Sequence, residues 1–251
     1  YPPTPASQAN SKVQAAITGF PIVVWYKENE NATLKCLGVY NFNNDKADTT
    51  TFGYTSAFPN CESWEFRNNT STHCLFQNSD FEDTVEVTKN FEARYPDKYT
   101  NYTNLSRVVS WVVSTNGNLD KFKNEFNNYF NLESTLLYYC LTELFAMVDS
   151  RAKNLFLTTW DGNIWYPTFY DMDTAFGLNN EVEYHDIIGT KNAFNGESSV
   201  LWNNFEQVYA DEIQDFYNNL RNNKLVTYDT VMNVLYEQQI SKICENNYNY
   251  D

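Results

Sequence analysis

Residues 148–177 read VDSRAKNLFLTTWDGNIWYPTFYDMDTAFG, and this stretch decides the predicted fold. Two apolar runs, 154–160 and 163–170, flank the pair Asp161-Gly162. An Asp-Gly pair between two such runs indicates a β-hairpin, because a type I′ turn needs positive φ at both central residues. We therefore predict a hairpin that carries acidic and amide side chains at its open end.

The expected register places some of these polar side chains on one face. If Asp161-Gly162 forms a two-residue turn, Asn154 faces Phe169 across the ladder. Strand side chains alternate between faces, so Asn154 and Asp171 share a face, with Asp173 beyond them if the strand continues. Diagonal neighbours lie roughly 7–8 Å apart, close enough to hold a metal ion between two side chains. A solvated, polar hairpin end is the alternative interpretation.

Composition excludes several classes of function. The chain has 251 residues and a formal net charge of −15. This charge argues against nucleic acid as a partner, because phosphate binding needs clustered Lys and Arg. It also argues against anionic membrane surfaces, and no run approaches the roughly 18 apolar residues of a membrane span. An aromatic content of 17% predicts a folded core.

The order of the expected elements predicts an α+β fold. Residues 1–18 read as a linker or arm, and Tyr1-Pro-Pro-Thr-Pro suggests that the chain is a fragment of a longer one. We expect residues 19–90 to be β-rich and residues 91–251 to be mainly helical. Strands are expected at 20–26, 33–42, 63–66 and 73–76. Helices are expected at 102–116, 120–130, 132–148, 199–222 and 228–246.

The five cysteines do not indicate a zinc site. None belongs to a C-x-x-C pair, and the chain has only two histidines. Cys61 and Cys74 flank a polar loop and could form a disulfide, with ordinary buried thiols as the alternative. Cys140 lies within an apolar helical pattern, which favours a buried thiol.

The predicted site has the spacing of a kinase catalytic loop. Asp149 and Asn154 form D-x-x-x-x-N, in which the Asp of protein kinases accepts the proton of the attacking hydroxyl and the Asn holds a metal. A hairpin then leads to Asp171, where kinases carry a metal-binding Asp. Phosphoryl transfer depends mostly on positioning and charge neutralisation, so few protein groups are required.

At these residues the chain resembles the spore-coat protein H (CotH) family of atypical kinases. The segment Tyr-Asp-Met-Asp-Thr-Ala-Phe-Gly, residues 170–177, is similar to the family's W-D-x-D-x-x-F-G, with Tyr170 in place of Trp. Residues 19–26 and 37–40 are similar to its strand–turn–strand with G-x-Y. The resemblance implies a kinase-like fold with a β-rich N-terminal lobe, a helical C-terminal lobe and a metal-site hairpin.

The resemblance also implies an activity and its residues. It implies transfer of phosphate from ATP, with Mg²⁺, to Ser or Thr hydroxyls of a partner protein. Asp149 would be the catalytic base, Asn154 and Asp171 the metal ligands, and Asp173 an alternative ligand. Lys35 and Lys46 are the candidates for the nucleotide-binding cation, with exposed lysines as the alternative reading.

One departure from the family pattern leaves a second reading open. The family usually has an acidic residue six positions after the Gly of G-x-Y, where this chain has Asn44 beside Asp45. A chain without the ATP-side cation would be a catalytically degenerate, kinase-like structural module. Similar domains occur in large surface, cellulosome-associated and bacteriophage virion proteins, so we expect a virion or extracellular location and neighbouring subunits as partners.

Overall fold

The computed structural model describes residues 4–66, 90–151, 153–178 and 199–237. They belong to two compact units. The sheet unit holds Tyr1–Ile17 and Lys46–Phe216, and the hairpin unit holds Thr18–Asp45 and Tyr217–Asp251. Helices and antiparallel sheets are both present, so the predicted α+β class is confirmed. The units divide the chain differently from the predicted boundary near residue 90. No helix in the described part of the chain is long and apolar enough to cross a membrane.

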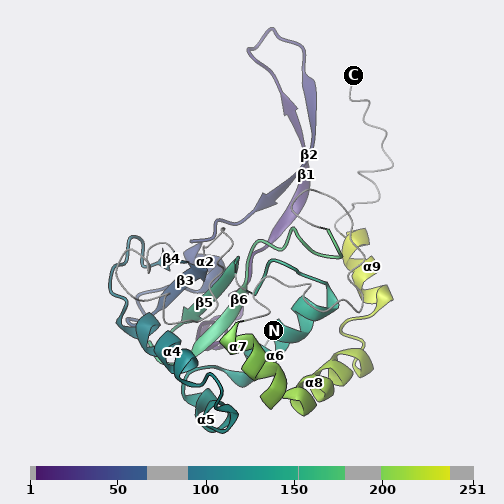
Figure 1. Ribbon diagram of the computed structural model, residues 1–251. Coiled ribbons are helices and arrows are strands. Elements are labelled where there is room, and N and C mark those ends of the chain that lie inside the picture. Colours follow the sequence, from purple (N-terminus) through teal and green to yellow (C-terminus); the bar gives the residue numbers. More distant parts are fainter. Residues whose placement is uncertain (1–3, 67–89, 152, 179–198, 238–251) are drawn as a thin grey trace. The chain divides into compact units, whose positions relative to one another are not determined.

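The sheet unit is built on a four-stranded antiparallel sheet in the order β4-β3-β5-β6 (Figure 1). The predicted strand at 63–66 and both strands of the predicted hairpin at 154–170 are present, and the expected strand at 73–76 lies outside the described residues. The strands are β3 (Glu62–Phe66), β4 (Phe91–Tyr95), β5 (Leu155–Thr159) and β6 (Trp165–Phe169).

Both faces of this sheet are covered, which explains why β5 and β6 are buried along their whole length. On one face, Leu155, Leu157 and Trp165 join the main hydrophobic core with residues of α4 (Thr103–Ser114), α6 (Leu132–Leu144) and α7 (Val200–Val208). On the other face, Phe156 and Tyr166 pack with side chains of the N-terminal segment and of α2 (Thr49–Phe52). Strands buried on both faces read as continuous apolar runs, as these two do in the sequence.

The predicted helices are present in the described part of the chain, and residues 238–246 of the last one lie outside it. The helix expected to reach residue 148 ends at Leu144, and Ala146 has a φ of 50° that no α-helix continues. The helix expected over 199–222 is two helices separated at Tyr209. The helices are α1 (Pro5–Ala9), α2 (Thr49–Phe52), α4 (Thr103–Ser114), α5 (Leu119–Glu125), η2 (Phe126–Asn128), α6 (Leu132–Leu144), α7 (Val200–Val208), α8 (Ala210–Asn222) and α9 (Tyr228–Glu237).

The described residues 4–17 of the N-terminal segment are part of the core, where the sequence predicted a linker or arm over residues 1–18. Thr4 caps α1 through a capping box with Ser7. Ala6, Val13 and Ala15 are buried in the second hydrophobic cluster. The segment then pairs with the sheet, since the Ile17 amide donates to the Phe169 carbonyl at 3.1 Å.

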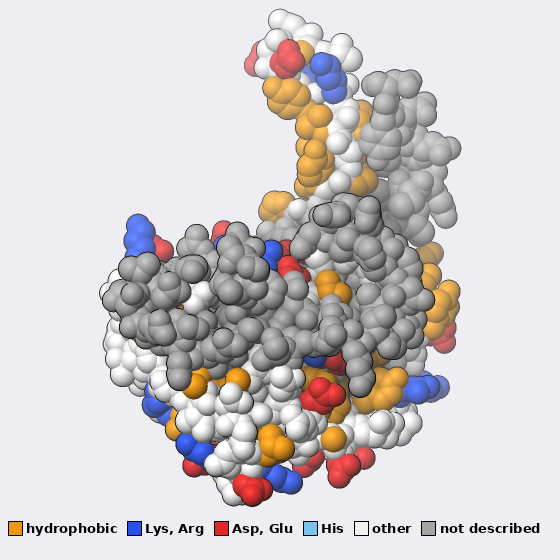
Figure 2. Space-filling view, in the orientation of Figure 1, with side chains coloured by type: hydrophobic (Ala, Val, Ile, Leu, Met, Phe, Trp, Pro, Cys, Tyr) orange, Lys and Arg blue, Asp and Glu red, His pale blue; other side chains and the backbone are white. Residues whose placement is uncertain are grey.

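The hairpin unit contains the other predicted strand pair. β1 (Gly19–Tyr26) and β2 (Lys35–Asn43) pair antiparallel, as predicted. Apolar side chains are exposed along both strands, and Figure 2 shows them in orange over this hairpin. The exposed group includes Phe20, Trp25, Leu37, Val39, Tyr40 and Phe42.

The β5–β6 hairpin has a register one residue away from the predicted one. Leu155, not Asn154, faces Phe169, and the strands are joined by the five-residue loop 160–164. The Asp161 carboxylate causes this difference. Its Oδ1 accepts hydrogen bonds from the Asn163 and Ile164 amides at 2.7 and 2.8 Å, which closes an Asx-type loop in place of a type I′ turn.

The structure confirms that Cys61 and Cys140 are buried thiols. Cys61 is a free, buried thiol, so the alternative Cys61–Cys74 disulfide is not present, and Cys74 itself lies outside the described residues. Burial, with a smaller contribution from the Glu62 charge, raises the pKa of Cys61 to about 12. Cys140 is also free and buried, as the helical pattern indicated.

Candidate functional site

Local backbone conformation, and not strand alternation, positions the side chains at the open end of the hairpin. The ladder stops at Leu155 and Phe169. The flanking Asn154 and Asp171 have φ values of 56° and 50°, in the left-handed region that Asn and Asp tolerate best among residues with a Cβ. The argument that alternation puts Asn154 and Asp171 on one face was therefore wrong, because neither residue continues its strand.

Asp149 and Asn154 are brought together as their spacing predicted. Both are buried, and the Asn154 Nδ2 donates a hydrogen bond to the Asp149 Oδ2 at 3.3 Å. The Lys153 Nζ lies 3.3 Å from the same carboxylate oxygen. Because the amide nitrogen of Asn154 is directed to Asp149, its oxygen is the atom available as an acceptor or metal ligand.

Arg151 fixes the loop that carries these residues. Its guanidinium contacts α6: Nη2 lies 2.6 Å from the Glu143 Oε1, and the group lies over the Tyr139 ring at 4.2 Å. The Arg151 carbonyl accepts from the Trp202 indole at 2.8 Å. One buried Arg thus ties the segment between Asp149 and Asn154 to α6 and α7.

Asp171 lies among other acids. Partial burial of the carboxyl group raises the pKa of Asp171, and the charges of Asp173, Glu65 and Asp149 raise it further, while Lys153 lowers it. Asp171 and Asp173 are otherwise exposed to solvent. The loop that carries them is fixed by the Val148 amide, which donates to the Thr174 carbonyl at 3.3 Å. The charges of Asp149 and Lys153, both in the Asp149–Asn154 loop, therefore affect the pKa of Asp171.

Lys46 lies at the edge of this acidic group. Its Nζ is 3.2 Å from the Glu65 Oε2 and 5.5 Å from the centre of the Tyr170 ring. Glu65 is mostly buried on β3 and also pairs with Arg94. Lys35 differs, since it is an exposed residue of β2 in the hairpin unit, opposite Tyr26. Of the two predicted lysines, the structure puts Lys46 beside an acid of the site.

The sequence alone did not identify Glu65, Lys153 and Arg151 as residues of the site. Glu65 has no motif and reaches the site through the pairing of β3 with β5. Lys153 and Arg151 lie within the D-x-x-x-x-N segment, but the spacing does not say which cation faces the acids. Periodicity gives no signal there, because the segment is a loop.

The donor chemistry suits Mg²⁺, although no group of three or more His, Cys, Asp or Glu side chains in the described ranges could hold a metal alone. Asp171 supplies a carboxylate whose pKa is raised by burial and by neighbouring acids, and Asn154 supplies an amide oxygen. Mg²⁺ is commonly held by one or two carboxylates together with substrate phosphates, not by a closed protein cage. The residues present fit an open site of that kind.

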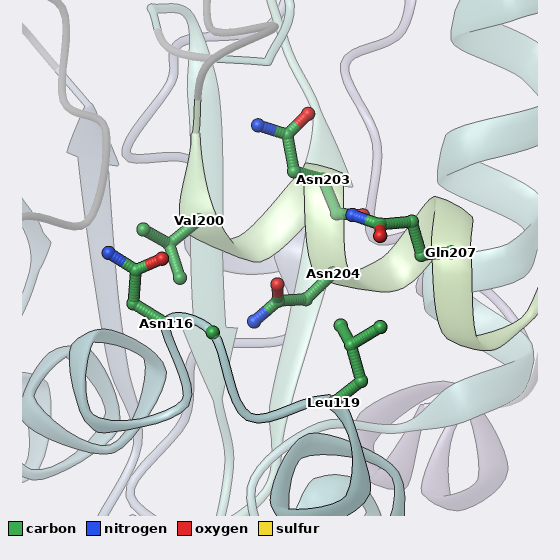
Figure 3. Close-up of a pocket in the computed structure, with 7 residues that line it drawn as sticks. Asn116, Leu119, Val200, Asn203, Asn204 and Gln207 are labelled. Atoms are coloured by element: carbon green, nitrogen blue, oxygen red, sulfur yellow. The ribbon is translucent and has the colours of Figure 1, made fainter.

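A pocket of about 500 Å³ elsewhere in the sheet unit does not contain this chemistry. It lies between the α4–α5 turn and α7, and Figure 3 shows its amide side chains. The Asn204 Nδ2 donates to the Thr115 Oγ1 at 3.0 Å, so part of the lining is engaged in the fold. Its labelled lining residues are Asn116, Leu119, Val200, Asn203, Asn204 and Gln207.

Fold and site together define an α+β protein with a D-x-x-x-x-N loop and a second acid at the open end of a central β-hairpin. Comparison with protein families gives the particular family. The model of the CotH kinase protein family matches residues 38–249, most of the chain, and the chain belongs to this family. A search of curated proteins found no match.

Proposed function

We propose that this chain is an ATP- and Mg²⁺-dependent kinase domain that phosphorylates Ser or Thr hydroxyls of a partner protein. Family membership supports a kinase-like activity. The observation that carries the proposal is the Asp149–Asn154 contact, a buried carboxylate held by an amide whose oxygen is left for a metal. We include in the proposal a kinase-like division into two lobes, with the β5–β6 hairpin as the metal-site hairpin.

Each residue of the site has a role in this proposal. Asp149 accepts the proton of the attacking hydroxyl, and Asn154 holds its carboxylate in place. Asn154 and Asp171 would hold Mg²⁺, with Asp173 as an alternative ligand. When bound, the ion neutralises charge on the phosphates. Burial of Asp149 keeps bulk water from competing for the proton.

Lys46 is the better candidate for the nucleotide-binding cation. Its ion pair with Glu65 resembles the Lys–Glu pair that positions the phosphate-binding lysine of protein kinases. The ion pair orients the Lys46 ammonium group, and the side chain, at 34% exposure, stays accessible to solvent. Lys35, which belongs to the hairpin unit, stays a candidate.

Nucleotide binding and transfer test the proposal separately. We expect Mg²⁺ and ATP together to raise the melting temperature of the wild type, and Asp171→Asn to reduce that shift. Asp149→Asn should keep the shift but abolish autophosphorylation, measured by mass spectrometry. Asp97→Asn, at a side chain 87% exposed, removes the same charge and should change neither. No shift with MgATP in the wild type would overturn the proposal.

A specific observation supports a second candidate function. The β1–β2 hairpin exposes apolar side chains on both strands, among them Phe42 at 59% exposure. Large exposed apolar surfaces mark sites of protein association. A catalytically degenerate module that contacts neighbouring subunits of a virion or extracellular assembly would use such a hairpin. Nucleotide binding without phosphate transfer in the experiment above would favour this function.

A further inference from the structure

The acidic site contains a cation of the chain itself. Lys153 precedes Asn154, and its Nζ lies 3.3 Å from the Asp149 Oδ2. Asp149 is almost fully buried, with 2% of its side chain exposed, whereas the Lys153 side chain is 30% exposed. The ammonium group therefore approaches a buried carboxylate from the solvent side, as an incoming metal ion would.

Lys153 is one of two cations in this loop, and it is the one that lies beside the Asp149–Asn154 contact. The other cation of the loop, Arg151, is directed to Glu143 and the Tyr139 ring.

We infer that the Lys153 ammonium group takes the place of a divalent cation beside Asp149, and that it must be displaced when the metal binds. This inference rests on the proposed function for the identity of the metal site. The geometry supports it, because Lys153 and Asn154 contact the same oxygen of Asp149. A metal on the Asn154 oxygen would lie next to that ammonium, and like charges at such a distance repel.

Lys153 therefore has a positioning role for the Asp149–Asn154 loop. In the metal-free protein its charge balances that of the buried Asp149 carboxylate, which holds the Asp149–Asn154 loop in place. When a divalent cation takes over this charge balance, the long and flexible lysine stem lets the ammonium group move toward solvent. The displaced ammonium group is then free to contact an anionic group of the substrate.

Mn²⁺ binding without nucleotide tests the inference directly. Isothermal titration should show that Lys153→Met binds Mn²⁺ on the order of tenfold more tightly than the wild type, because a competing charge is gone. Lys153→Arg keeps that charge and should bind within about twofold of the wild type. Lys121→Met is the matched control, since Lys121 lies on α5 and contacts Ser114. It should also bind within about twofold of the wild type.

Stability gives a second measurement that a merely exposed lysine would not affect. In EDTA, Lys153→Met should melt at a lower temperature than the wild type, and saturating Mn²⁺ should abolish this difference. Equal or weaker Mn²⁺ binding by Lys153→Met, or no binding by any variant, would overturn the inference. A wild type that is stabilised by MgATP in that case keeps the proposed function, so the two failures are distinguishable.

Discussion

The Asn154 amide donates a hydrogen bond to the Asp149 carboxylate at 3.3 Å while its own backbone holds a φ of 56°. Asn is one of the few residues with a Cβ that adopts this conformation at low cost. One residue type thus satisfies the backbone at the start of β5 and orients the proposed catalytic acid. The D-x-x-x-x-N spacing therefore has a structural reason here as well as a chemical one.

Substitutions at Asn154 separate these two contributions. We expect Asn154→Ala to lower the free energy of unfolding by about 2–3 kcal/mol, from the lost hydrogen bond and the strained φ. Asn154→Gly loses the same bond but accepts positive φ, so it should be about 1 kcal/mol more stable than Asn154→Ala. Urea denaturation measures both. Equal losses in the two variants would show that the backbone conformation contributes nothing.

Asp171 should make stability depend on pH. Its pKa is raised above the ordinary value of 3.8, so the folded state holds the proton more tightly than the unfolded state. Stability is then greatest below about 3.8 as far as this group is concerned, and it falls as pH rises through the folded pKa. Ionised Asp171 destabilises the protein at neutral pH, unless a cation is bound.

Asp171→Asn should therefore raise the melting temperature at pH 7 in EDTA. The gain should disappear as the pH falls below the ordinary pKa of an Asp, and Mg²⁺ should reduce it at pH 7. Asn also accepts the positive φ of this position, so the variant adds no backbone strain. A scan of melting temperature against pH measures the effect, with Asp97→Asn as the exposed control. A gain that does not change with pH would contradict this account.

Much of the fold could be predicted because local patterns determine it. The strand pair around residues 20–42 follows from β-branched and aromatic runs, and α4 follows from apolar residues at helical spacing. The N-terminal segment was predicted to be a linker or arm because its prolines suggested an extended chain. Its burial depends on Ala6 and Val13 fitting against Phe52, a contact that no local pattern shows.

The site was predictable only in part, for a similar reason. The spacing of Asp149 and Asn154 is local, and the structure brings the two together as expected. The register failed because the Asp161 carboxylate accepts two backbone amides and lengthens the loop. Glu65 could not be found, because it meets Lys46 only after β3 has paired within the sheet.

Arg151 should be important for stability, because its buried guanidinium binds groups of α6. Its guanidinium donates to the Thr142 hydroxyl at 3.1 Å and stacks on the Tyr139 ring inside the core. Arg151→Met should lower the free energy of unfolding by about 2–4 kcal/mol, because buried acceptors lose their donor. Arg221 lies over the Tyr217 ring at 5.8 Å but is exposed, so Arg221→Met should cost less than about 0.5 kcal/mol.

Thermal or urea denaturation of the two variants measures this contrast. Arg151→Lys should restore little of the loss, since an ammonium group cannot donate along the plane that Arg151 uses. Because the Arg151 carbonyl also binds the Trp202 indole, the substitution should loosen the Asp149–Asn154 loop. Hydrogen exchange at residues 149–154 would report that loosening. Similar losses for Arg151→Met and Arg221→Met would contradict the role of the buried contact.

The loop at the other end of the β5–β6 hairpin offers a test of why its register differs from that of a two-residue turn. Besides two backbone amides, the Asp161 Oδ1 accepts from the Thr159 hydroxyl at 3.0 Å, and Arg107 donates to the Gly162 carbonyl at 3.1 Å. Asp161→Ala should cost about 1–2 kcal/mol of unfolding free energy, because the loop loses its acceptor. Asp161→Asn keeps an oxygen there and should lose less than half as much.

Both substitutions should leave MgATP binding unchanged, since the loop lies at the end of the ladder opposite Asn154. A loss of nucleotide binding in Asp161→Asn would mean that the loop affects the site through the strands.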